Sequence, residues 1–79
     1  MRVSEVFLSE KSKYAGKAIT ESGIYEDTGL NIVAIQDPES PEDFIYNPPQ
    51  NHVLKGNSKL VVIGDSDHID LLMDLANPV

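Results

Sequence analysis

Apolar and polar positions along the first third of the chain predict a strand followed by a short helix. Residues 2–8 alternate between two faces, which is typical of a strand, and the charged Glu5 indicates that one of these faces is partly wet. Residues 15–23 predict a helix of about two turns that ends at Gly23, where a C-terminal glycine stop belongs. We expect residues 24–25 to restart an extended segment.

The middle of the chain predicts three further strands. Residues 30–36 (LNIVAIQ) are almost continuously apolar, which favours a central strand that is buried on both faces. Residues 44–46 predict a short strand that is closed by Asn47-Pro48-Pro49, because neither proline can donate a ladder hydrogen bond. Residues 59–63 (KLVVI) are rich in β-branched side chains and predict another strand.

The C-terminal segment predicts an amphipathic helix. Ile69, Leu72, Met73 and Ala76 follow the i, i+3, i+4, i+7 spacing of a packed helix face. The order of elements predicts one α+β domain over residues 1–79, with a small, mainly antiparallel sheet, a short N-terminal helix and a C-terminal helix.

Charge narrows the range of partners. The chain has 13 acidic and 6 basic residues, for a net charge of −7, and its basic cluster (Lys11, Lys13 and Lys17) lies beside Glu10. Because contacts to a phosphate backbone need clustered cations, we expect no nucleic acid partner. The longest apolar run, residues 60–63, is too short for a bilayer, and the N-terminus does not resemble a signal peptide. We therefore expect a cytoplasmic location.

The sequence offers no catalytic frame. It contains no cysteine, and its two histidines, His52 and His68, lie in different segments outside any Ser/His/Asp pattern. Neither H-E-x-x-H nor G-x-S-x-G occurs. We expect no catalytic residues and no enzymatic activity.

Two acidic segments raise the question of a metal site. Residues 65–70 (DSDHID) do not match a calcium loop, because Ile69 stands where an oxygen ligand is needed, and helix capping is the favoured interpretation. Residues 37–43 (DPESPED) carry four carboxylates and are interpreted as a solvated loop. We predict no metal site, and keep a divalent cation held in pairs across a dimer as the less favoured alternative.

A series of motifs resembles the TrkA C-terminal (RCK C-terminal) domain family of potassium channels and potassium transport regulators. The resemblance covers about residues 3–75, with the motifs in the family's order and spacing. They are YAGKAI at 14–19, GLNIVAI at 29–35, NP at 47–48 and HVLKGNSKLVVIG at 52–64, followed by a helical segment at 69–75. Asn57 departs from the family's usual aspartate, but asparagine tolerates the same left-handed turn.

The resemblance implies a cytosolic ligand-sensing regulatory domain that forms a two-fold homodimer. It implies a small-molecule effector at the dimer interface, held by Asn31, Ile32 and His52. Ile32 would offer an apolar wall to a base, Asn31 its amide, and His52 a hydrogen bond or a stacking surface. A nucleotide or cyclic dinucleotide is the effector class to test first, and no bound cofactor is implied.

The partner that the resemblance implies is a membrane potassium channel or transporter subunit, with effector binding coupled to ion flux. No G-x-G-x-x-G dinucleotide-binding motif occurs in the sequence. The alternative is a purely structural dimerisation module that binds no small ligand.

The small size of the domain predicts self-association. A chain of 79 residues buries only about 60–65% of the surface that its unfolded form exposes, so pairing is an economical way to cover apolar side chains such as those of residues 30–35. We expect light scattering to show a dimer at about 100 μM, since an interface of standard size associates more tightly than that. A monomer at this concentration would contradict the prediction.

Overall fold

A four-stranded antiparallel sheet and three helices make up the computed structural model, which describes residues 1–78. The predicted domain, residues 1–79, ends one residue outside this range. The spatial order of the strands is β1-β4-β2-β3, and all neighbours run antiparallel. The α+β class and the antiparallel sheet are as predicted. The elements are β1 (Arg2–Phe7), α1 (Ile19–Ser22), α2 (Ile24–Thr28), β2 (Asn31–Gln36), β3 (Phe44–Tyr46), β4 (Lys59–Gly64) and α3 (Ser66–Ala76).

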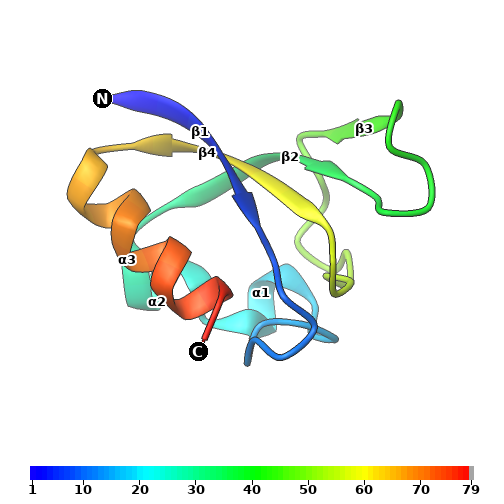
Figure 1. The fold of residues 1–79 in the computed structure, drawn as a ribbon, viewed down its shortest axis with the longest axis horizontal. Coiled ribbons are helices and arrows are strands. Elements are labelled where there is room, and N and C mark those ends of the chain that lie inside the picture. The colour runs from blue at the N-terminus through cyan, green and yellow to red at the C-terminus, as the bar shows by residue number, and fades with distance from the viewer. Residues whose placement is uncertain (79) are drawn as a thin grey trace.

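The helices lie together on one side of the sheet, and the core fills the space between these two layers (Figure 1). Strand β4 occupies the centre, paired with β1 on one side and β2 on the other. Its side chains alternate as a two-faced strand requires: Leu60 and Val62 are fully buried toward the helices, while Ile63 remains 42% exposed on the outer face. The other core side chains are Val6, Leu8, Tyr14, Ile24, Leu30, Ile35, Leu54, Ile69, Leu72 and Ala76.

Strand β2 is buried less completely than its sequence predicts. Its burial is mixed, and the side chain of Val33 is 36% exposed. The register against β4 shifts between Ile32 and Ala34, so Val33 has no direct partner on β4. The prediction of burial on both faces is therefore wrong, because the helices cover only one face of the sheet.

The short helical region begins later and continues further than predicted. Helix α1 has only four residues, and it ends at Gly23, whose left-handed φ of 87° confirms the predicted glycine stop. The extended segment predicted after Gly23 is wrong, because Ile24 starts helix α2. The left-handed glycine turns the chain, so that Ile24 enters the core with 2% of its side chain exposed. Gly29, at φ 74°, ends α2 in the same way.

The turn after the proline loop keeps its expected conformation. Asn57 has a φ of 71°, so asparagine adopts the left-handed conformation as predicted. Its backbone N–H donates to the carbonyl of Leu8 at 2.6 Å, and the N–H of Leu8 donates to the carbonyl of Ser58 at 2.8 Å. These bonds continue the pairing of β1 and β4 beyond the ends of the two strands.

Helix α3 presents the predicted face to the core. Leu72 is fully buried, whereas Asp74 is exposed. Leu72→Ala should therefore lower the free energy of unfolding by about 2–4 kcal/mol, because it leaves a cavity in the core where α3 packs. Asp74→Ala is the matched control and should change it by less than about 0.5 kcal/mol. Urea melts with equal losses for the two variants would contradict this helix phase.

Candidate ligand-binding site

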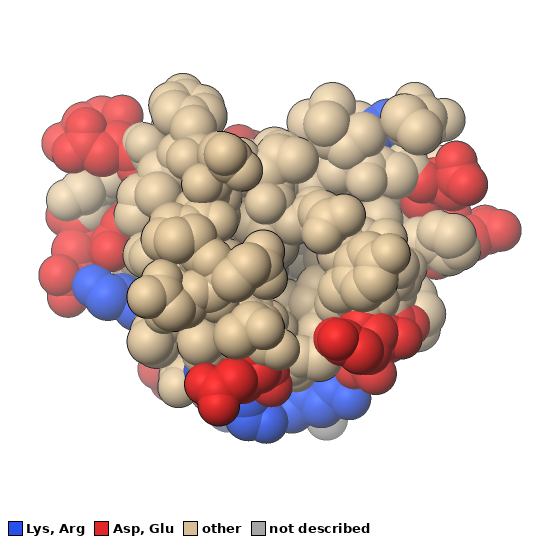
Figure 2. All heavy atoms as spheres, turned by 180° about the vertical axis from the view of Figure 1, so that it is seen from behind, with Lys and Arg blue, Asp and Glu red and all other residues tan. Residues whose placement is uncertain are grey.

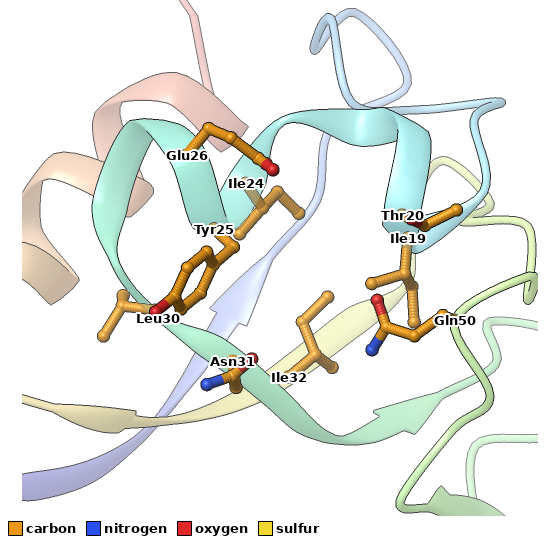
Figure 3. Close-up of a pocket in the computed structure, with 9 residues that line it drawn as sticks. All are labelled: Ile19, Thr20, Ile24, Tyr25, Glu26, Leu30, Asn31, Ile32 and Gln50. Atoms are coloured by element: carbon orange, nitrogen blue, oxygen red, sulfur yellow. The ribbon is translucent and has the colours of Figure 1, made fainter.

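A pocket of about 240 Å³ opens between the short helices α1 and α2 and the start of β2. Figure 3 shows its side chains converging from these elements and from the loop that follows β3. The lining residues are Ile19, Thr20, Ile24, Tyr25, Glu26, Leu30, Asn31, Ile32 and Gln50.

The floor of the pocket is apolar. Ile24 and Leu30 belong to the buried core, and Ile19 and Ile32 pack against that core while remaining partly accessible. In Figure 3 Ile19, Ile24 and Ile32 lie close to one another across the space between α1, α2 and β2. Such a floor suits the flat, weakly polar face of a base or another planar group.

Polar groups surround this floor. Figure 3 places Tyr25 and Asn31 on one side and Gln50 on the other, with Thr20 above Ile19. Tyr25 leaves 59% of its surface exposed, so its ring is available for stacking. The amides of Asn31 and Gln50 each supply a donor and an acceptor, which suits recognition of the edge of a planar ligand.

Backbone hydrogen bonds fix the loop after β3 to the first helix. The N–H of Thr20 donates to the carbonyl of Gln50 at 2.9 Å, and the N–H of Ile19 donates to the carbonyl of His52 at 3.0 Å. Ala18 and Val53 form an isolated antiparallel bridge beside them. These contacts set the position of Gln50 relative to α1.

A buried tyrosine anchors helix α2 from behind. The hydroxyl of Tyr14, which is fully buried, donates to Asp27 Oδ2 at 2.8 Å. Lys13 Nζ lies 3.0 Å from the same oxygen. Burial, together with the neighbouring carboxylate, raises the pKa of Tyr14 far above its ordinary value. The hydrogen bonds from Lys13 and Tyr14 lower the pKa of Asp27.

The structure brings together two of the three residues predicted for the ligand site. Asn31 and Ile32 line the pocket, whereas His52 is not among the lining residues. Gln50, two positions earlier, takes part instead, and the backbone of His52 supports α1. The sequence analysis did not predict the remaining lining residues, which include Tyr25 and Gln50.

Two features of the sequence could have predicted helix α2: the acidic residues of its first turn and the glycine that follows it. Glu26 and Asp27 lie in the first turn of α2, where carboxylates favour a helix start, and Gly29 follows its last residue. Tyr25 was missed because residues 24–25 were expected to be extended, whereas Tyr25 lies in α2. No local pattern marks Gln50, since its place in the pocket depends on pairing with a distant segment.

Within residues 1–78 no three His, Asp or Glu side chains gather to hold a metal ion. Asp37 of the acidic loop is instead engaged by its neighbours: Lys55 Nζ lies 3.1 Å from Oδ2, and the N–H of Glu39 donates to Oδ1 at 2.8 Å. These hydrogen bonds lower the pKa of Asp37, with that from Glu39 contributing most.

The second acidic segment, residues 65–70, caps helix α3 by position but not by a side-chain hydrogen bond. Asp65 occupies the N-cap position of α3, but its side chain makes no capping hydrogen bond. Its carboxylate lies 3.8 Å from the N-terminal amine.

No helix in the described part of the chain has the length and apolar run that crossing a membrane requires.

The fold and the pocket place the chain in the general class of small α+β domains with a candidate ligand site. Comparison with known proteins identifies the family. The family model described as the TrkA-C domain matches residues 3–77, so the chain belongs to this family. The resemblance found in the sequence motifs is thereby confirmed.

Solved structures of regulators share the fold. The RCK_C domain dimer of S. agalactiae BusR in complex with c-di-AMP is 28% identical at a TM-score of 0.84, over 98% of this chain and 97% of that one. The RCK C domain of the potassium transport protein KtrA in complex with c-di-AMP is 28% identical (TM-score 0.76; 91% and 79%). The GsuK channel bound to NAD is 30% identical (TM-score 0.78; 94% and 13%). Comparison with curated proteins gives no match.

The exclusion of nucleic acid as a partner is wrong. S. agalactiae BusR in complex with its busAB-promoter DNA is 29% identical to the chain at a TM-score of 0.82. The match covers 95% of this chain but only 35% of the BusR chain. The exclusion rested on the charge of these 79 residues alone, and the charge of one domain does not limit the partners of a longer protein that contains it.

The hydrogen bond from Tyr14 to Asp27 should contribute to stability. Tyr14→Phe keeps the ring in place but removes the hydroxyl, so we expect a loss of about 1 kcal/mol in the free energy of unfolding at pH 7. Urea melts of both proteins measure this difference. An unchanged midpoint would show that the bond contributes nothing.

The lowered pKa of Asp27 predicts a specific dependence of stability on pH. Its contribution is present above the ordinary pKa of an aspartate and is lost as the pH falls through the lowered value in the folded state. In thermal melts between pH 7 and pH 3, Asp27→Asn should therefore flatten the acid limb. Asp74→Asn, an exposed change of the same chemistry, should retain the slope of the wild type, and equal flattening would contradict the assignment.

Proposed function

We propose that this chain is a cytoplasmic ligand-sensing regulatory domain of a potassium channel or potassium transport system. The pocket between α1, α2 and β2 takes a nucleotide effector, with a cyclic dinucleotide as the first candidate. Binding is coupled to ion flux through the rest of the transport system. The domain itself performs no catalysis.

The observation that carries this proposal is the pocket's combination of an apolar floor with amide groups at its rim. Ile19, Ile24 and Ile32 provide the floor, while Asn31 and Gln50 provide hydrogen bonds. This chemistry suits a nucleobase. BusR and KtrA domains of the same fold have been solved in complex with c-di-AMP, which supports the choice of ligand.

The size of the pocket supports a site shared between two copies. Ligand pockets typically hold about 300–1,000 Å³, and the 240 Å³ found in one chain is small for a complete dinucleotide. A two-fold interface presents the same residues twice and therefore suits a ligand with two equivalent bases. The BusR domain is a dimer in its c-di-AMP complex, in keeping with this arrangement.

In a second candidate function, this domain still senses a ligand, but the full-length protein regulates DNA binding instead of ion flux. The similarity to BusR, which has been solved with promoter DNA, favours a sensing domain within a DNA-binding regulator. The chain spans 35% of that BusR chain and 13% of the GsuK chain, so segments beyond these residues decide between the two outputs. A transmembrane pore or a DNA-binding domain in the same full-length chain would distinguish them.

A thermal-shift panel tests the proposed ligand class. Cyclic di-AMP, NAD, AMP and CaCl₂ are added to the wild type, and a cyclic dinucleotide at about 100 times its Kd should stabilise the domain by about 2.7 kcal/mol. Asn31→Ala and Gln50→Ala should weaken this shift, because each removes an amide from the pocket rim.

Asn51→Ala is the matched control, since this exposed residue follows Gln50 but does not line the pocket. His52→Ala tests the third residue predicted from the sequence, which should matter less if only the lining residues contact the ligand. A shift with CaCl₂ alone would favour the acidic loop at residues 37–43 instead. A stable dimer that responds to none of these additives would favour the structural module.

A further inference from the structure

The pocket lacks a positive charge. Its lining residues include no lysine and no arginine, and Glu26 is the one acidic side chain among them. Three of the six basic residues lie within 4.0 Å of an aspartate: Arg2 pairs with Asp70, Lys13 with Asp27 and Lys55 with Asp37. These three cations are thus paired with aspartates that do not line the pocket.

Charged side chains are also absent from the centre of one face of the domain. Figure 2 shows that the face turned away from the viewer in Figure 1 carries no charged side chain over its centre. Carboxylates lie along both sides of this face and at its lower edge, where Lys and Arg side chains lie beside them. The net charge of −7 gives the domain as a whole a negative potential, and the centre of this face adds no cation that would offset it.

Glu26 differs from the carboxylate that follows it in sequence. Asp27 is balanced by Lys13 Nζ at 3.0 Å and accepts a hydrogen bond from Tyr14. Glu26, in contrast, has no ion-pair partner within residues 1–78. Its charge is therefore uncompensated at the pocket.

We propose that Glu26 sets the charge selectivity of this pocket, so that the affinity for a phosphate-bearing ligand rises with ionic strength. This inference rests on the nucleotide-binding function proposed above. Sites that hold phosphate with lysine or arginine lose affinity as salt screens the attraction. Here the interaction with the phosphates is repulsive, so screening by salt favours binding.

The domain would then respond to its effector and to the salt concentration together. At low ionic strength the acidic surface opposes the ligand over about 10 Å or more, and this opposition shortens to a few ångströms as salt approaches 1 M. Short-range contacts with the apolar floor and the amide rim are little affected by salt. Removing the charge of Glu26 should therefore matter most at low salt, where we expect Kd to fall about threefold.

Calorimetric titration of the 79-residue domain tests this proposal. Cyclic di-AMP is titrated at about 50, 150 and 500 mM KCl, and again in NaCl, into the wild type, Glu26→Gln and Glu21→Gln. Glu21 is the matched control, because it is an exposed glutamate of α1 that does not line the pocket. Adenosine, which carries no phosphate, serves as the uncharged probe.

The expected result is a Kd for cyclic di-AMP that decreases with either salt in the wild type, and decreases less in Glu26→Gln than in Glu21→Gln. The affinity for adenosine should stay nearly constant. A Kd that increases with salt would overturn the proposal, since it would place cations of the second copy at the phosphates. Equal salt dependence in the two variants would overturn the role of Glu26. Absence of any nucleotide binding at all three salt concentrations would instead overturn the proposed function, and this inference with it.

Discussion

The packing of three helices onto one face of the sheet is the constraint on which the rest of the structure depends. Leu60 and Val62 of β4 and Ile24 of α2 belong to one buried core, and the burial of Ile24 in it fixes where α2 begins. Gly23 makes this burial possible, because its left-handed backbone turns the chain from α1 into α2. The pocket lies beside this turn, so its geometry follows from core packing.

The sequence predicts the strands well because their side-chain patterns are local. Residues 59–63 and 2–8 show the composition and the alternation of strands, and both lie in the sheet as β4 and β1. The residues 24–25 were misassigned because β-propensity in so short a segment is overridden by tertiary packing. An isoleucine that enters the core from a helix has the same local sequence signal as one that enters from a strand.

The candidate site was predicted only in part, for a similar reason. The family resemblance pointed to Asn31 and Ile32 at the start of the central strand, and both line the pocket. Gln50 reaches the pocket because its carbonyl accepts a hydrogen bond from Thr20, thirty positions earlier in the chain. Such a contact is not visible in the local sequence. The uncompensated charge of Glu26 likewise emerges only when the ion pairs of its neighbours are known.

The central claim is that a nucleotide binds between α1, α2 and β2, and chemical-shift mapping of the labelled domain tests it most directly. On addition of cyclic di-AMP, the account predicts that backbone amide shifts concentrate at residues 19–32 and at Gln50. They should saturate at one ligand for every two chains, since each pocket accommodates half of a symmetric ligand. Shifts confined to residues 37–43, or none at saturating ligand, would contradict the account.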